Sequence, residues 1–379
     1  MAIDRLFLLM KEKAASDMFF AVNAPIQVKI NGNLYPINQQ KMDQAMILNL
    51  LSEFVPSARM AELERDSELN IGIPVTGVGS FRLSAFRQRG SISAVLRYIP
   101  SHIPALKDAN LPPQLAELIM AKRGLLLVVG ATGSGKSTTI ASMLDYRNES
   151  TAGHILTLED PIEFLFKNKR SIVNQREIGS DSASLSLALK NALRQAPDCI
   201  LIGEIRDKET MSAAIAYSQS GHLVVATLHA NNSYQALNRI MNFFPLENRQ
   251  ALLSDLAATL KAVVSQRLIA AIDGGRRAAV EILINTRHVA ELIEKGDLGQ
   301  VKDAIEKSMA PGSQTFEQAL MQMISANVIT KDEALAHADS ATNLFWMLNN
   351  KGDKTPEAGP APATVPDEGA TFTEFTLNV

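Results

Sequence analysis

The chain has 379 residues, of which 46% are hydrophobic and 20% are charged, and this composition is typical of a folded protein with about two domains. Its formal net charge of −3 gives no excess of basic residues for gripping a phosphate backbone, so we expect no nucleic-acid partner. The single cysteine, Cys199, excludes an internal disulfide and a four-cysteine zinc module, and it fits a reducing compartment.

The first twenty residues mix charged and apolar positions. A secretory signal needs an uninterrupted apolar core and a cleavage site of small residues, and this stretch has neither. No apolar run of the sequence approaches the roughly 20 residues that are needed to cross a bilayer. We therefore expect a cytoplasmic protein whose association with a membrane comes through its partners.

Residues 1–99 have the pattern of a small mixed domain. Leu6, Leu9 and Met10 lie at helical spacing near its start, and a second helical pattern covers residues 43–54. The turn residues 31–33 between two short apolar runs predict a hairpin. Strand patterns follow at residues 69–73, 81–86 and 92–99. Residues 100–113 contain several prolines and show little periodicity, which predicts a linker.

From residue 114 to residue 350, apolar runs alternate with helical patterns. The runs are short, bounded by turn signals or charges, and cover residues 125–129, 154–158, 199–202 and 223–227. They predict an α/β domain of mainly parallel strands that are buried on both faces. Residues 268–284 predict a further hairpin, and helical patterns continue to residue 348. Residues 351–379 are rich in Pro, Ala, Gly and Glu, which predicts a disordered tail.

The loop at residues 130–137 reads GATGSGKS and lies between a predicted strand and a predicted helix. This pattern is typical of a loop that holds the phosphates of ATP, because its glycines let backbone N–H groups approach phosphate oxygens closely. Lys136 is expected to reach the β and γ phosphates, and Ser137 to bind Mg²⁺. An ordinary glycine-rich turn is the weaker alternative. The expected nucleotide-binding residues are Gly130, Ala131, Thr132, Gly133, Ser134, Gly135, Lys136, Ser137 and Thr138.

Hydrolysis also needs carboxylates, and two acidic clusters follow predicted strands. Glu159, Asp160 and Glu163 follow one strand, and Glu204 follows another, in a segment that also contains Arg206. In an open parallel sheet, ligands bind at the carboxyl ends of the strands. Each acid alone would be interpreted as a solvated loop residue, but two clusters beside a phosphate loop favour a catalytic role. We expect Glu159 and Glu204 to be candidate Mg²⁺ ligands.

Two histidines bracket one predicted strand, and a group of arginines lies in the N-terminal domain. His222 and His229 are about 20 Å apart if the strand between them is extended, so only one can reach the γ-phosphate. His229 lies at the carboxyl end of that strand and is therefore the candidate for contact with the γ-phosphate. Arg82 and Arg97 lie on neighbouring predicted strands. Chance clustering on a solvated face is the ordinary explanation, whereas an arginine delivered to the γ-phosphate is the functional one.

Several boxes, taken in order, resemble the secretion ATPases of type II and type IV pilus machines. They are GATGSGKSTT from residue 130, LEDPIEF from residue 158, IGEIRD from residue 202, GHLVVATLHANN from residue 221 and SFRLSAFRQRG from residue 80. The resemblance covers nearly the whole chain before the tail. It implies a PAS-like N-terminal domain, a RecA-like ATPase domain and a homo-hexameric ring.

The resemblance also implies a role for each matching site residue. Glu163 would polarise the attacking water, and Glu204 would be the acid of the second nucleotide motif. Arg82 and Arg97 would close onto the γ-phosphate from the N-terminal domain. His222 and His229 would form the histidine box of the family, and Arg206 would support the site.

Within this family, the chain resembles the retraction branch of the type IV pilus ATPases, because it lacks a cysteine module. The segment after residue 286 lacks the arginines that are usual in that branch, and this departure places the resemblance on the PilU side of the PilT/PilU family. It implies an accessory Mg²⁺-dependent ATPase in twitching motility, with a paralogous retraction ATPase and an inner-membrane platform protein as partners. The alternatives are a nucleotide-gated scaffold with little turnover and, less favoured, a nucleic-acid translocase.

Overall fold

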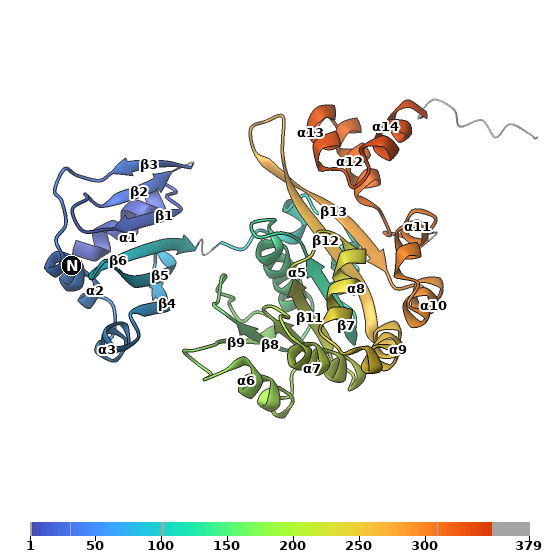
Figure 1. Cartoon of the computed structure of the whole chain (residues 1–379), viewed down its shortest axis with the longest axis horizontal. Helices are drawn as coiled ribbons and strands as arrows, with labels where there is room; N and C mark the ends of the chain where they lie inside the picture. Colours follow the sequence, from blue (N-terminus) through green and yellow to red (C-terminus); the bar gives the residue numbers. More distant parts are fainter. Residues whose placement is uncertain (1, 31, 100–101, 309, 351–379) are drawn as a thin grey trace, which may run out of the picture.

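The computed structural model describes residues 2–30, 32–99, 102–308 and 310–350 (Figure 1). It has two sheets, one of six strands near the N-terminus and one of seven strands in the rest of the chain. A group of short helices follows the second sheet. The predicted tail at 351–379 and the first two residues of the predicted linker lie outside the described residues.

The N-terminal sheet has the strand order β3-β2-β1-β6-β5-β4, and all of its pairings are antiparallel. The hairpin predicted at residues 26–37 is confirmed as β2 and β3. The elements are α1 (Ala2–Glu12), β1 (Asp17–Phe20), β2 (Gln27–Ile30), β3 (Asn33–Pro36), α2 (Gln44–Ser52), α3 (Ser57–Asp66), β4 (Glu68–Val75), β5 (Gly79–Gln88) and β6 (Ser91–Ile99).

Strand alternation decides which side chains of this sheet point away from the N-terminal core. Phe81, Leu83 and Ala85 on β5 are buried in the N-terminal core together with α1. Successive residues of a strand point to opposite faces, so Arg82 points away from that core. Its register partner on β6 is Arg97. The two arginines predicted on neighbouring strands are therefore cross-strand neighbours.

The seven-stranded sheet has the order β13-β12-β7-β11-β10-β8-β9, and only the pairing between β12 and β13 is antiparallel. This confirms the prediction of a mainly parallel sheet. Its elements begin with α4 (Gln114–Ile119), β7 (Gly124–Val129), α5 (Lys136–Ser150), β8 (Gly153–Glu159), β9 (Ser171–Glu177), α6 (Leu185–Ala192), β10 (Cys199–Ile202), α7 (Lys208–Gln219) and β11 (Leu223–Leu228). They continue with α8 (Ser233–Asn242), α9 (Arg249–Thr259), β12 (Leu260–Ala270), β13 (Arg276–Ile284), α10 (Arg287–Lys295) and α11 (Val301–Glu306).

Helices cover both faces of this sheet, which explains why its central strands are apolar throughout. On β7, Leu125 and Leu127 pack into one core with residues of α6 to α11, while Leu126 and Val128 pack into another with α4 and α5. All six residues of β7 are buried. Strands of this kind carry an unbroken apolar run instead of an alternating one.

Three helices end the described chain: α12 (Phe316–Ser325), α13 (Lys331–His337) and α14 (Ala341–Asn349). They share a small core that contains Phe316 and Leu344 and also Ile269 of β12. Within the predicted linker, a short 3-10 helix at residues 106–108 buries Leu106 against the core that contains α4 and α5. No helix among the described residues is both long and apolar enough to span a bilayer.

Candidate nucleotide site

The phosphate loop connects β7 to the first turn of α5, as its sequence predicts. Gly133 and Gly135 adopt φ values of +78° and +89°, a backbone conformation in which a side chain would be strained. Lys136 begins α5, and its Nζ donates to the carbonyl oxygens of Gly130 and Ala131, at 2.8 Å each. Burial lowers the pKa of the Lys136 amine, while the nearby charges of two glutamates oppose that shift.

A cavity of about 770 Å³ lies beside this loop and is lined by residues of the N-terminal sheet and of the later part of the chain. Its volume falls in the range of small-molecule sites. The cavity brings together residues that are far apart in sequence. The sequence-predicted residues that line it are Arg82, Arg97, Thr132, Gly133, Gly135, Lys136, Ser137, Thr138, Glu159, Glu163, Glu204, Arg206 and His229.

Two of these acids lie at the carboxyl end of β8, and they have different environments: Glu159 is the last residue of the strand, and Glu163 is in the loop after it. Glu163 is half exposed and lies 3.1 Å from the Arg82 guanidinium. Arg82 Nε has no hydrogen-bond partner among the described residues, so the guanidinium has a free donor. Glu159 instead accepts hydrogen bonds from Thr157 (2.6 Å) and Gln175 (3.2 Å). Burial raises the pKa of Glu159 despite those bonds, which favours its protonated form.

Glu204 lies at the carboxyl end of β10 between two basic groups. One oxygen is 3.1 Å from His229 Nε2, and the other accepts from Arg206 Nε at 2.7 Å. Arg206 also approaches Asp160, at 3.7 Å. These contacts hold the Glu204 carboxylate in one orientation at the edge of the cavity. His229 therefore lines the cavity and also contacts Glu204.

The remaining sequence-predicted residues differ in whether they line the cavity. Arg97 lines the cavity, but its Nε donates to Asp17 at 2.7 Å, because the two residues are register partners on β6 and β1. His222 stands at the opposite end of β11 from His229, with Nδ1 3.2 Å from the carbonyl oxygen of Tyr217. It does not line the cavity. Ser134 is buried, and its hydroxyl has no hydrogen-bond partner in the described part of the chain.

Residues of β12 and β13 that no sequence motif pointed to complete the site. Thr139 of α5 donates to Gln266 of β12 at 2.8 Å, and both side chains are buried. Leu268 and Arg276, on opposite sides of the hairpin turn, line the cavity. A buried glutamine within an apolar strand was the available signal, because a polar side chain in such a place needs a partner.

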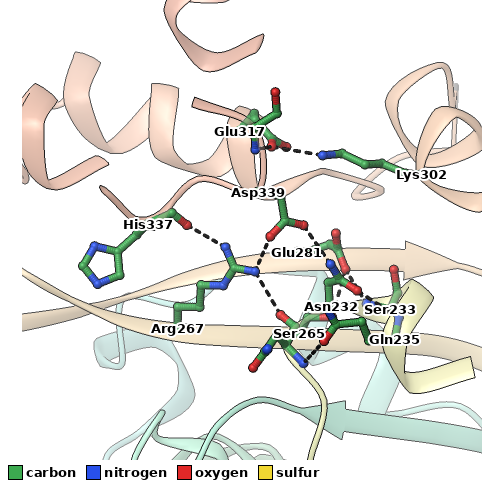
Figure 2. A network of polar contacts seen from close by, with 12 residues as sticks. Asn232, Ser233, Gln235, Ser265, Arg267, Glu281, Lys302, Glu317, His337 and Asp339 are labelled. Carbon is green, nitrogen blue, oxygen red and sulfur yellow. Dashed lines mark hydrogen bonds and ion pairs between the residues drawn. The ribbon is translucent and has the colours of Figure 1, made fainter. Parts of the chain in front are cut away.

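Arg267, the next residue of β12, contacts the C-terminal helices and the loop before α8 (Figure 2). Its guanidinium donates to the carbonyl oxygens of His337 (2.6 Å) and Asn231 (3.1 Å) and pairs with Asp339. It also lies 3.9 Å from the centre of the Phe316 ring. Because successive residues of a strand face opposite ways, Gln266 contacts the helix that follows the phosphate loop while Arg267 contacts the C-terminal helices.

Comparison with known proteins identifies relatives along nearly the whole chain. The family model described as "Type II/IV secretion system protein" matches residues 2–336. The type IV pilus ATPase PilU of Pseudomonas aeruginosa is 44% identical over 92% of this chain and 91% of its own length. PilT of the same organism, a type IV pilus retraction ATPase, is 36% identical over 91% of this chain and 100% of its own. A crystal structure of the pilus retraction motor PilT with bound ADP superposes with a TM-score of 0.84 and 38% identity, covering 90% of this chain and 99% of that one. The chain belongs to the type II/IV secretion ATPase family.

Proposed function

We propose that this protein is an Mg²⁺-dependent ATPase that assists type IV pilus retraction as an accessory to a paralogous retraction ATPase. One observation carries the proposal: a single cavity contains the phosphate-loop Lys136, the acids Glu163 and Glu204, and Arg82 from the N-terminal sheet. That set contains a loop that binds phosphates, a carboxylate that can orient water, and a cation, Arg82, that comes from the N-terminal sheet. The names of PilU and PilT supply the biological setting.

In the proposed reaction, ATP places its phosphates on the loop and the Lys136 amine exchanges its carbonyl partners for phosphate oxygens. Glu163 orients the water that attacks the γ-phosphorus. In the structure its carboxylate is paired with Arg82. The γ-phosphate would compete for that guanidinium, and the exchange would free Glu163 while drawing the N-terminal sheet inward. Nucleotide occupancy would thus be coupled to the movement of a domain, which is the step that does mechanical work.

Mg²⁺ prefers oxygen ligands and usually keeps several waters beside one or two protein groups and the substrate phosphates. The Ser137 hydroxyl and the Glu204 carboxylate both line the cavity, so this donor set fits. When bound, the ion would neutralise the charge that develops on the phosphate oxygens. No group of three or more His, Cys, Asp and Glu side chains in the described ranges could hold a metal ion alone. Glu159 is the third candidate, in its ionised form.

Phosphate release from purified protein tests the turnover. We expect Lys136→Ala and Glu204→Ala to lower kcat by about 10² or more, because each removes a preorganised charge from the site. Lys122→Ala, an exposed lysine just before β7, is the matched control. Equal rates in all four proteins would contradict the proposal, and tight ATP binding without turnover would favour a scaffold.

The pilus role predicts a specific cellular result. We propose that the protein forms a homo-hexamer at the cytoplasmic side of the inner membrane and acts with the paralogous ATPase through a platform protein. Cells without the gene should retract their pili less well under load. Cells that keep this protein but lack every other retraction ATPase should not retract at all. Unchanged retraction after deletion of the gene would argue against the role.

A further inference from the structure

Glu177 ends β9 beside the loop that carries Glu163. It is only 8% exposed, yet no basic side chain lies within ion-pair distance of its carboxylate in the part of the chain that the structure describes. One oxygen accepts from the backbone N–H of Ile162 at 3.1 Å, and the other accepts from the hydroxyl of Ser180 at 3.2 Å. One oxygen of this nearly buried carboxylate is therefore hydrogen-bonded to the backbone of Ile162, the residue before Glu163.

The N-terminal part of the chain rests on the same carboxylate. Gly72 of β4 is the register partner of Arg82. A Cβ at position 72 would lie 3.0 Å from Glu177 Oε2, which is a tight contact, so any larger residue there would require the Glu177 carboxylate to shift. Arg59 of α3 donates to the carbonyl oxygen of Gly179 (2.9 Å) and to Ser180 (3.2 Å). The hydroxyl of Ser180 thus receives one hydrogen bond and passes another to Glu177.

We propose that Glu177 is a positioning residue: it holds the Ile162–Glu163 backbone in place and is the surface on which the N-terminal sheet seats when Arg82 meets Glu163. This inference rests on the proposed role of Glu163 in hydrolysis. It links the placement of the water-orienting carboxylate to the placement of the sheet, because both are fixed against one side chain. Arg59 of α3 completes this contact surface through its hydrogen bonds to Gly179 and Ser180.

The chemistry of Glu177 separates a positioning role from a charge role. A glutamine at 177 can still accept the N–H of Ile162 through its amide oxygen, and its NH₂ group can donate to the hydroxyl of Ser180, which turns to accept. An alanine leaves the Ile162 N–H without its acceptor. A displacement of about 1 Å in a reacting group can cost about 10² in rate. The two substitutions should therefore differ strongly.

The test compares full-length wild-type protein, Glu177→Ala and Glu177→Gln by steady-state ATP hydrolysis. We expect Glu177→Ala to lower kcat by about 10-fold to about 100-fold with KM for ATP within about threefold of wild type. Glu177→Gln should recover kcat to within about threefold. Wild-type kcat in Glu177→Ala, or a loss that appears only in KM, would overturn the inference. A glutamine variant as slow as the alanine variant would also overturn it, because charge and not position would then matter.

Hydrogen exchange of the same proteins gives a readout that does not depend on turnover. The amide of Ile162 should be protected in wild type and in Glu177→Gln and should exchange faster in Glu177→Ala. Equal protection in all three proteins would overturn the inference even if the protein hydrolyses ATP. If wild-type turnover does not exceed that of Lys136→Ala, the proposed function fails, and the exchange experiment still decides the role of Glu177.

Two substitutions in the N-terminal part of the chain test its contact with Glu177 and Ser180, and each has a matched control. Gly72→Ala inserts a methyl group against Glu177, whereas Gly299→Ala adds one with no atom within 4 Å. Arg59→Ala removes the contact with Ser180, whereas Arg65→Ala removes an exposed arginine of the same helix. We expect the first of each pair to lower kcat by about threefold to about tenfold, with the controls unchanged. If Gly72→Ala lowers kcat no more than Gly299→Ala does, and Arg59→Ala no more than Arg65→Ala does, the inference is overturned.

Discussion

Glu281 on β13 offers a test of how burial controls ionisation next to the Arg267 network (Figure 2). The side chain is 2% exposed, and its Oε1 accepts from the Ser233 N–H at 2.8 Å and from the Ser265 hydroxyl at 2.9 Å. Burial raises the pKa of Glu281 above its ordinary value of 4.5, the bonds from the two serines oppose the shift, and the charge of Asp339 adds to it. The folded protein therefore binds this proton more tightly than the unfolded chain.

The sign and size of the effect follow from proton linkage. Below the ordinary pKa, both states carry the proton, and the stabilisation from the raised pKa is fully present. Between the ordinary and the raised pKa only the folded state carries it, so the free energy of unfolding falls by up to about 1.4 kcal/mol for each pH unit. Above the raised pKa the loss is complete. Glu281→Gln removes this dependence and keeps an acceptor for the N–H of Ser233.

Urea unfolding followed by far-ultraviolet circular dichroism, from about pH 4 to about pH 8, measures the difference between the two proteins. Glu281→Gln should gain stability relative to wild type as the pH rises from the acid end. Glu306→Gln, an exposed glutamate at the end of α11, is the control and should show no such trend. A difference between Glu281→Gln and wild type that stays constant across the whole range would refute the reasoning.

Three further predictions concern other parts of the fold. Gln266→Leu removes the bond from Thr139 and should weaken ATP binding by roughly tenfold in a fluorescent-nucleotide titration; unchanged affinity would show that β12 does not support the phosphate loop. Arg267→Ala should lower the free energy of unfolding by about 2 to 4 kcal/mol, since Asp339 loses its cationic partner and keeps only the hydrogen bond from Asn232, and a cost under about 0.5 kcal/mol would contradict this. Cys199 is fully buried, and burial raises the pKa of its thiol to about 12, so iodoacetamide should label it only after unfolding.

Local pattern was sufficient for the phosphate loop and for the sheet that carries it. The glycines and lysine of 130–137 stand at fixed spacing between an apolar run and a helical pattern, and the structure has β7, the loop and α5 there. Runs such as 199–202 predicted buried parallel strands because helices cover both faces of the sheet. Short or weakly periodic elements escaped prediction. The strand β1 has only four residues, and α3 buries only Leu63.

The site as a whole depended on contacts that no local pattern contains. The partners Arg82 and Glu163 are 81 residues apart, and their meeting requires the N-terminal sheet to lie against the ATPase part of the chain. Arg97 lines the same cavity, and strand pairing also places it beside Asp17, a contact that no local pattern contains. The phosphate loop, the acids at strand ends and the family can be recognised from the order of the amino acids, because those features depend on residue type and spacing. Which charges meet follows from the folded chain alone, since the contacts depend on register, strand order and the approach of one sheet to another.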